Sequence, residues 1–257
     1  MPRSHHGGRH ELGQNFLTHR PTIDRIVSLV HRAPGSILEL GAGDGALTRA
    51  LAGLGRRLTA LEIDEHRARR LDAALPHVRV IAADALRHPL DADVIVGNIP
   101  FHVTTPILRR LLSTSDWRHA VLLTQWEVAR KRAGVGGSTM MTAQSAPWFT
   151  VELCGRVPAW AFVPQPSVDG GLLSITRRAA PLVPLRDRKA YEEFVRAVFS
   201  ARGTSLATML AVAARTTAPR ARAALGDAGA PARRLPRDLR PEEWAILWHR
   251  LGRRSRP

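Results

Sequence analysis

Residues 36–45 read Ser36-Ile37-Leu38-Glu39-Leu40-Gly41-Ala42-Gly43-Asp44-Gly45, an apolar stretch followed by three glycines at alternate positions. An apolar run that ends in a glycine-rich turn is typical of a buried strand leading into a helix. Glycine also allows the main chain to turn sharply and to approach a ligand closely. The spacing G-x-G-x-G differs from the G-x-G-x-x-G of dinucleotide enzymes. On its own, the turn is compatible with a purely structural role, a nicotinamide enzyme or another ligand site.

The segments on either side of this turn alternate between helices and short apolar strands. Apolar residues spaced i, i+3, i+4, i+7 from Ile23 to Val30 predict a helix that starts near Pro21 and ends at Pro34-Gly35. Strands are predicted at 36–40, 57–61, 77–82, 93–96 and 120–124, and helices at 46–54, 65–75, 104–112 and 126–133. This alternation predicts an α/β fold, a Rossmann-like parallel sheet with helices on both faces.

The pattern changes in the second half of the chain. Residues 149–157 and 171–177 are strand-like, which suggests an antiparallel addition to the sheet, and residues 134–137 form a glycine-rich loop. Beyond residue 178 only helices are predicted, at 187–200, 203–213, 218–228 and 242–251. We therefore expect an α/β domain at 1–177 and a small all-α domain at 178–257.

Charge is the strongest compositional signal. The 257 residues include 38 Lys and Arg against 22 Asp and Glu, a formal net charge of +16. Such an excess points to a polyanion, most simply nucleic acid, because no basic amphipathic helix of the membrane-binding kind is evident. Without a long apolar run or a signal segment, a cytoplasmic protein is expected. The lone Cys154 and the histidines show no zinc spacing, so no metal site is predicted.

Acidic and amide side chains follow successive predicted strands. Glu62 lies 21 residues after Gly41, where doubly wound folds place an acid against ribose hydroxyls. Asp84 follows the third strand of this series and can accept a hydrogen bond from an adenine amino group. Asn98 follows the fourth. Because ligands bind at the carboxyl ends of parallel strands, the set describes a site for an adenosine-containing cofactor.

Asn98-Ile99-Pro100-Phe101 combines an amide, a rigid proline and an aromatic ring at the end of a strand. The amide offers an acceptor to amine hydrogens, Pro100 fixes its own φ angle, and Phe101 offers a stacking face. A surface turn would explain the same residues in isolation. Beside the upstream cofactor residues, the segment indicates a grip on a flat base.

Together these motifs resemble class I S-adenosylmethionine-dependent methyltransferases. More narrowly they resemble the Erm family of 23S rRNA adenine-N6 methyltransferases, which confer macrolide–lincosamide–streptogramin B resistance. The resemblance covers roughly residues 10–178. The motifs that carry it are Gly13-Gln14-Asn15-Phe16-Leu17, the glycine turn, Glu62, Asp84, Asn98 to Phe101, Gln125 to Arg130 and Pro164 to Gly170. Phe101 stands where many relatives carry Tyr, so a stacking role is kept and a hydroxyl role is not.

The resemblance implies roles for individual residues in transfer of a methyl group to adenine N6. Asn98, Ile99, Pro100 and Phe101 would hold the amine, with the Asn98 side chain and the Ile99 carbonyl accepting its hydrogens. Phe101 and Phe162 would stack on the base, although Phe162 could equally be a core residue. Cofactor contacts would come from Asn15, Leu17, Gly41, Gly43, Glu62, Ile63, Asp84, Ala85 and Asn98.

The implied partner is 23S rRNA, in precursor or protein-free form, bound by a monomer. Basic side chains near the substrate edge would contact phosphate: Arg109, Arg110, Arg130, Lys131 and Arg132. In this interpretation residues 1–177 form the S-adenosylmethionine-binding catalytic domain, and the small helical domain at 178–257 binds RNA. The nearest alternative is a dimethyladenosine transferase of small-subunit rRNA. More distant alternatives are a DNA adenine methyltransferase, a catalytically silent RNA-binding factor on the same fold, and a nicotinamide dehydrogenase.

Overall fold

The structure, a computed structural model, describes residues 15–252 except 115 and 232. These residues form two compact units, one from residues up to 129 together with 152–176, and one from 130–151 together with residues from 177 onward. Residues 130–151 therefore group with the C-terminal residues, although they precede the expected boundary at 177. The reason is that the helix within this segment packs against the C-terminal helices. The phenol of Tyr191 donates a hydrogen bond to the carbonyl of Ala143 at 2.9 Å.

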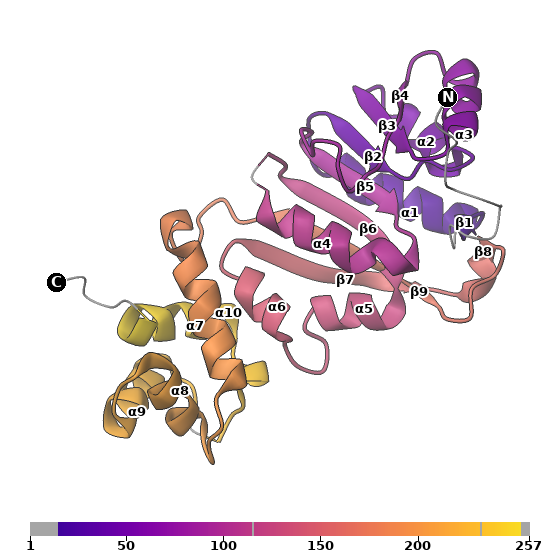
Figure 1. Ribbon diagram of the computed structural model, residues 1–257. Coiled ribbons are helices and arrows are strands. Elements are labelled where there is room, and N and C mark those ends of the chain that lie inside the picture. Colours follow the sequence, from indigo (N-terminus) through magenta and orange to yellow (C-terminus); the bar gives the residue numbers. More distant parts are fainter. Residues whose placement is uncertain (1–14, 115, 232, 253–257) are drawn as a thin grey trace, which may run out of the picture. The chain divides into compact units, whose positions relative to one another are not determined.

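The first unit is built on a seven-stranded sheet of order β4-β3-β2-β5-β6-β9-β7 (Figure 1). Only the first residues of β7 and the last residue of β9 belong to the second unit. Strands β2 to β6 pair in parallel, and β9 pairs antiparallel with β6. The strands are β2 (Ile37–Leu40), β3 (Leu58–Glu62), β4 (Arg79–Ala82), β5 (Val94–Asn98), β6 (His119–Gln125), β7 (Phe149–Val157) and β9 (Gly170–Arg177). The predicted α/β fold and the antiparallel addition are confirmed.

Within the described residues, helices precede, connect or follow the parallel strands, and only β4 and β5 are joined without one. They are α1 (Arg20–His31), α2 (Ala46–Ala52), α3 (Glu65–Ala74), the short 3-10 helix η1 (Phe101–Val103), α4 (Thr104–Ser113) and α5 (Trp126–Arg132). Helix α1 begins with Pro21 in its first turn and buries Ile23, Ile26 and Val30. The carboxylate of Asp64 caps α3 by accepting the backbone N–H groups of His66 and Arg67.

A second, two-stranded sheet joins the N-terminal segment to the chain before β9. Strand β1 (Phe16–Leu17) pairs antiparallel with β8 (Phe162–Val163), so that Leu17 lies opposite Phe162. The hydroxyl of Thr18 adds a hydrogen bond to the carbonyl of Ala161 at 3.1 Å. Two-residue strands are too short to show a periodic pattern, and the sequence analysis did not predict them.

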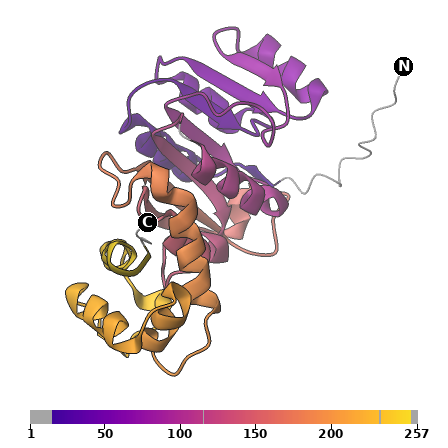
Figure 2. The same ribbon diagram turned by 60° about the vertical axis from the view of Figure 1, so that its left-hand side comes forward.

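The second unit is helical (Figure 2). Aromatic side chains pack together in its core. Its helices are α6 (Met140–Ser145), η3 (Leu185–Asp187), α7 (Arg188–Ser200), α8 (Leu206–Ala214), α9 (Ala218–Asp227), η4 (Pro236–Asp238), α10 (Pro241–Leu247) and the π-helical η5 (Trp248–Gly252). Tyr191 makes edge-to-face contacts with Trp148 and Trp248, and Phe199 stacks on Trp244. Among the described residues, no helix has the length and apolarity needed to cross a bilayer.

Candidate active site

The glycine turn after β2 adopts a conformation that other residues rarely take. Gly41 and Gly43 have φ angles of 76° and 56°, in the left-handed region. The backbone N–H groups of Gly41 and Ala42 both donate to the carbonyl of Leu61 at 2.9 Å, which ties the turn to β3. A Cβ atom on Gly43 would lie 2.9 Å from the ring of Phe16, whereas one on Gly41 would meet nothing within 4 Å. Gly41 therefore opens a surface that a ligand can approach.

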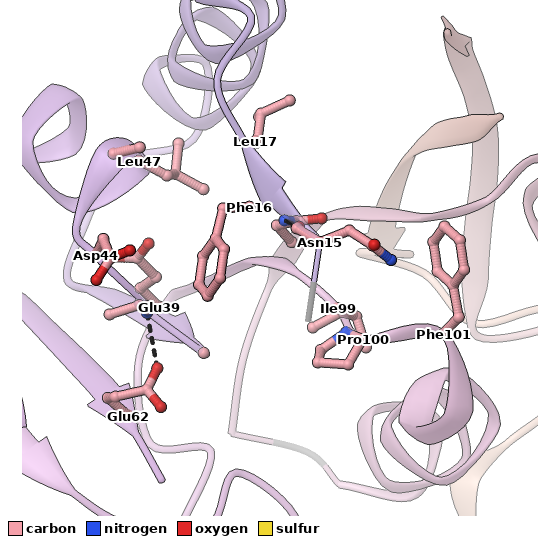
Figure 3. A pocket seen from close by; sticks show the side chains of 15 residues that line it. Asn15, Phe16, Leu17, Glu39, Asp44, Leu47, Glu62, Ile99, Pro100 and Phe101 are labelled. Atoms are coloured by element: carbon pink, nitrogen blue, oxygen red, sulfur yellow. Dashed lines mark hydrogen bonds between the residues drawn. The ribbon is translucent and has the colours of Figure 1, made fainter. Parts of the chain in front are cut away.

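This turn forms one wall of a pocket (Figure 3). The other walls come from the N-terminal segment, the ends of β2 and β3, the start of α2 and the segment after β5. The lining residues are Asn15, Phe16, Leu17, Glu39, Gly41, Ala42, Gly43, Asp44, Ala46, Leu47, Glu62, Asn98, Ile99, Pro100 and Phe101. The sequence prediction that Asn15, Leu17, Gly41, Gly43, Glu62 and Asn98 to Phe101 lie together agrees with this geometry.

Glu62 is buried at the end of β3 and is fixed by two backbone groups. Its Oε2 accepts the N–H of Gly43 at 2.7 Å, and its Oε1 accepts the N–H of Asp64 at 3.0 Å. A carboxylate oxygen can accept more than one hydrogen bond. Glu62 can therefore hold the glycine turn in place and still accept the hydroxyl groups of a ribose.

Glu39 lines the same pocket from β2, and the sequence analysis did not count it as a site residue. It is 1% exposed, and its Oε2 has no hydrogen-bond partner among the described residues. Burial raises the pKa of its carboxyl from 4.5 to about 7; Thr48 acts against this rise, and the neighbouring Glu62 adds to it. The available signal was an acid two positions before the first glycine of the turn.

A second cavity adjoins the pocket and shares Gly41, Glu62, Ile99 and Pro100 with it. Its remaining lining residues are Leu40, Leu61, Ile63, Ala83, Asp84, Ala85, Leu86, His102, Val103 and Ile107. Asp84 is positioned by a hydrogen bond of 2.8 Å from the N–H of Leu86 to its Oδ1. Apolar walls together with the carboxylate of Asp84 suit a flat base that carries an amino group. The predicted contacts Ile63, Asp84 and Ala85 all lie here.

The last residue of β5, Asn98, and the segment after it bring an amide and an aromatic ring to the pocket. The Nδ2 group of Asn98 donates to the carbonyl of Asn15 at 2.7 Å, which orients the amide. The N–H of Ile99 donates to the carbonyl of Leu123 at 2.9 Å and holds the segment against β6. Phe101 lies on the side of the pocket opposite Glu39 and Asp44 (Figure 3). Asn98 and Phe101 therefore both line the pocket, and the amide of Asn98 is held in orientation by Asn15.

Two predicted roles differ from the structure. Phe162 is 1% exposed and belongs to the hydrophobic core, because the pairing of β8 with β1 buries it. We therefore interpret Phe162 as a core residue and not as a ring that stacks on the base. Arg110 donates to the carbonyls of Ala85, at 2.6 Å, and His88, so its guanidinium fastens the loop after β4. We assign Arg110 a structural role in place of a phosphate contact.

The other predicted RNA-contacting residues vary in exposure. Arg109 and Lys131 are exposed, whereas Arg130 and Arg132 are half-buried. Arg132 donates to the hydroxyl of Thr139 at 3.1 Å. Gly13 and Gln14 of the first motif lie outside the described residues, and within those residues no cluster of three His, Cys, Asp or Glu is placed to hold a metal ion.

The pocket and its adjoining cavity fit a cationic adenosine cofactor. The left-handed Gly41 leaves room for a ligand, and the unpartnered Oε2 of Glu39 is suited to a positive charge. Glu62 would hold the ribose, and Asp84 with Ile63 the adenine. These residues lie at the carboxyl ends of β2, β3 and β4, where open α/β sheets bind ligands.

Comparison with known proteins agrees with this geometry. The family model described as ribosomal RNA adenine dimethylase matches residues 5–228. An rRNA adenine N-6-methyltransferase of Corynebacterium diphtheriae is 53% identical over 79% of this chain and 82% of its own length. The mycinamicin-resistance protein MyrB of Micromonospora griseorubida is 46% identical over 98% of this chain and 82% of its own.

A solved structure adds a match at the level of the fold. The 23S rRNA methyltransferase ErmE aligns with a TM-score of 0.83 at 34% identity, covering 93% of this chain and all of that one. The chain belongs to the ribosomal RNA adenine dimethylase family and is an Erm-like rRNA adenine N6-methyltransferase.

Proposed function

We propose that this protein transfers a methyl group from S-adenosylmethionine to N6 of one adenine in the peptidyl-transferase loop of 23S rRNA, and thereby confers macrolide-type resistance. The observation that carries the proposal is the oriented amide of Asn98, which lines the same acid-lined pocket as Phe101. The relatives named for 23S rRNA and for mycinamicin resistance support the choice of substrate.

The chemistry follows from the nitrogen that must react. The lone pair of adenine N6 is delocalised into the ring, so the site has to draw it onto nitrogen by accepting the amine hydrogens. The Oδ1 atom of Asn98 and the carbonyl of Ile99 would do this, while Phe101 stacks on the base. When bound, the cofactor supplies an electrophilic methyl group. Transfer of this group to N6 would form one N–C bond at the expense of the methyl–sulfur bond, and the nitrogen would then lose a proton to solvent.

No strong base is needed in this scheme, because the methylated amine is acidic before it loses its proton. Positioning therefore supplies most of the rate. A flipped adenine in an assembled ribosome is hard to reach, so we propose precursor or protein-free rRNA as the substrate. We further propose that the protein acts as a monomer in the cytoplasm.

The direct test is methyl transfer from labelled S-adenosylmethionine to protein-free 23S and 16S rRNA, with the modified nucleotide mapped. Label on one adenine of the 23S peptidyl-transferase loop supports the proposal, and product mass distinguishes one methyl group from two. Label on 16S adenines would instead assign the small-subunit dimethyladenosine transferase activity. Cofactor binding with no transfer to either RNA would favour a silent RNA-binding factor.

A further inference from the structure

A cavity of about 520 Å³ lies wholly within the second unit. Its walls are the loop 134–138, helix α6, the start of β7 and the segment 234–244. Five arginines line it: Arg132, Arg178, Arg234, Arg237 and Arg240. One carboxylate, Asp238, also lines it, so the cavity carries a strong excess of positive charge.

Acidic neighbours hold several of these guanidinium groups in place. Oε1 of the buried Glu243 lies 2.9 Å from Nη1 of Arg234 and 3.0 Å from Nη2 of Arg240. Arg178 lies 3.9 Å from Glu242 and also donates to the carbonyl of Ala146 at 3.0 Å. Among the ion pairs of the described residues, the four arginines Arg178, Arg234, Arg237 and Arg240 share three carboxylates, those of Asp238, Glu242 and Glu243, which leaves positive charge in a fixed arrangement.

The glycine loop shapes the wall beside Arg237. Gly137 has a φ angle of 112°, and a Cβ atom there would lie 3.3 Å from Cδ of Arg237. The N–H of Ser138 donates to the carbonyl of Arg237 at 2.7 Å. The loop thus packs directly on Arg237 and holds its main chain, while the side chain stays 62% exposed and paired with Asp238 only at 3.8 Å.

We propose that this cavity binds a phosphodiester group of the RNA substrate, with its nucleotide, through Arg237 and the neighbouring arginines. Guanidinium groups suit phosphate because their planar donors match two oxygens at once. A cavity of this volume is large enough for a nucleotide rather than a bare ion. The inference rests on the proposed function for the identity of the RNA.

The test compares Arg237→Glu with Arg250→Glu. Arg250 belongs to the same unit, does not line the cavity, is also 62% exposed and also pairs with one aspartate. Both variants change the net charge equally. We expect Arg237→Glu to weaken binding of a 23S rRNA fragment that contains the target adenine by about tenfold or more. Arg250→Glu should change it less than about threefold, since an exposed charge outside the contact contributes little.

Three further readouts separate the possible outcomes. Affinity for S-adenosylmethionine should be unchanged in both variants. If charge reversal lowers the melting temperature, the same comparison is made with Arg237→Ala and Arg250→Ala. A plot of the logarithm of the RNA-binding constant against the logarithm of the salt concentration should be less steep by about one phosphate contact in Arg237→Ala, and unchanged in Arg250→Ala. Equal losses in the two variants, or inorganic phosphate that binds the cavity while RNA does not, would overturn the proposal.

The same experiment distinguishes a failure of the proposed function. If the wild-type protein binds the fragment through Arg237 but methylates no 23S adenine, the cavity stands and the 23S methylation is wrong. In the opposite case, the wild-type protein methylates 23S rRNA, and Arg237→Glu binds and methylates the RNA as well as Arg250→Glu does. The proposed methylation then stands and the cavity assignment is wrong.

Discussion

Glu39 in the first unit and Glu243 in the second are both 1% exposed, yet their surroundings have opposite charge. Glu243 forms ion pairs with two arginines, Arg234 and Arg240, and its carboxylate also accepts a hydrogen bond from the backbone N–H of Arg240 at 2.7 Å. Glu39 faces a second acid, Glu62, and its Oε2 has no hydrogen-bond partner among the described residues. A buried acid that is already neutralised is part of the structure, whereas one without a cation marks a place where a positively charged ligand is stabilised.

The difference extends to the cavities around the two glutamates. The pocket of the first unit is lined by carboxylates and glycines and suits a cationic cofactor. The cavity of the second unit is lined by arginines and suits an anion. If this division is real, substitutions in the pocket of the first unit should affect cofactor binding or the transfer step, and substitutions in the second unit should affect RNA binding or stability and leave cofactor affinity unchanged.

The largest expected effect is on catalysis, from Asn98→Ala. This change removes the oriented acceptor while the glycine turn and Glu62 remain, so methyl transfer should fall by about a hundredfold to a thousandfold. Cofactor affinity, measured by calorimetry, should fall much less. Retention of most of the activity would remove Asn98 from the mechanism and weaken the assignment of the reaction to this pocket.

The next prediction tests the two buried glutamates directly, by unfolding Glu39→Gln and Glu243→Gln without cofactor. Because the pKa of Glu39 is raised in the folded protein, folding retains its proton, and the wild-type protein loses stability as pH rises from 4.5 through about 7. Glu39→Gln lacks this loss and should be more stable than wild type at pH 8, by up to about 3 kcal/mol.

Glu243→Gln should have the opposite sign at pH 8. It leaves Arg234 and Arg240 without their buried carboxylate, and because both arginines are partly exposed the cost should be about 1–2 kcal/mol. At pH 4 the Glu39→Gln advantage should vanish. Destabilisation by both variants at pH 8 would mean that the two glutamates are alike and that the contrast drawn between them is wrong.

Much of the first unit could be predicted because strand–helix alternation brings the carboxyl ends of parallel strands to one edge. Glu62 and Asn98 end β3 and β5, Asp84 follows β4, and the apolar run of each strand is visible in the sequence. Their presence around two adjoining cavities follows from that register.

The roles that sequence reasoning missed depend on contacts between distant segments. The burial of Phe162 requires two-residue strands to pair across more than 140 positions, and no local pattern encodes this. Arg110 has the sequence context of a surface arginine, but it donates to a carbonyl 25 residues away. The association of residues 130–151 with the second unit depends on α6, whose six residues are too few to show a helical period.

A smaller effect should separate Gly41→Ala from Gly55→Ala. Both glycines are left-handed, with φ angles of 76° and 64°, and a Cβ atom on either would meet nothing within 4 Å. The two variants should therefore lose similar stability, about 1 kcal/mol each. Only Gly41 lines the pocket, so only Gly41→Ala should weaken cofactor binding, by about tenfold. Equal cofactor affinities would show that the open surface at Gly41 is not used by the ligand.

The smallest effect should come from Tyr191→Phe in the second unit. The change removes one buried hydrogen bond, from the Tyr191 hydroxyl to the carbonyl of Ala143, and keeps the ring between Trp148 and Trp248. Denaturant unfolding should show a loss of about 1 kcal/mol. Cofactor affinity should not change, because the hydrogen bond joins two segments of the second unit and the pocket is lined by the first. A shift in cofactor affinity with this single oxygen removed would show that the units are energetically coupled, and the division between a cofactor-binding unit and an RNA-binding unit would then have to be replaced by one cooperative site.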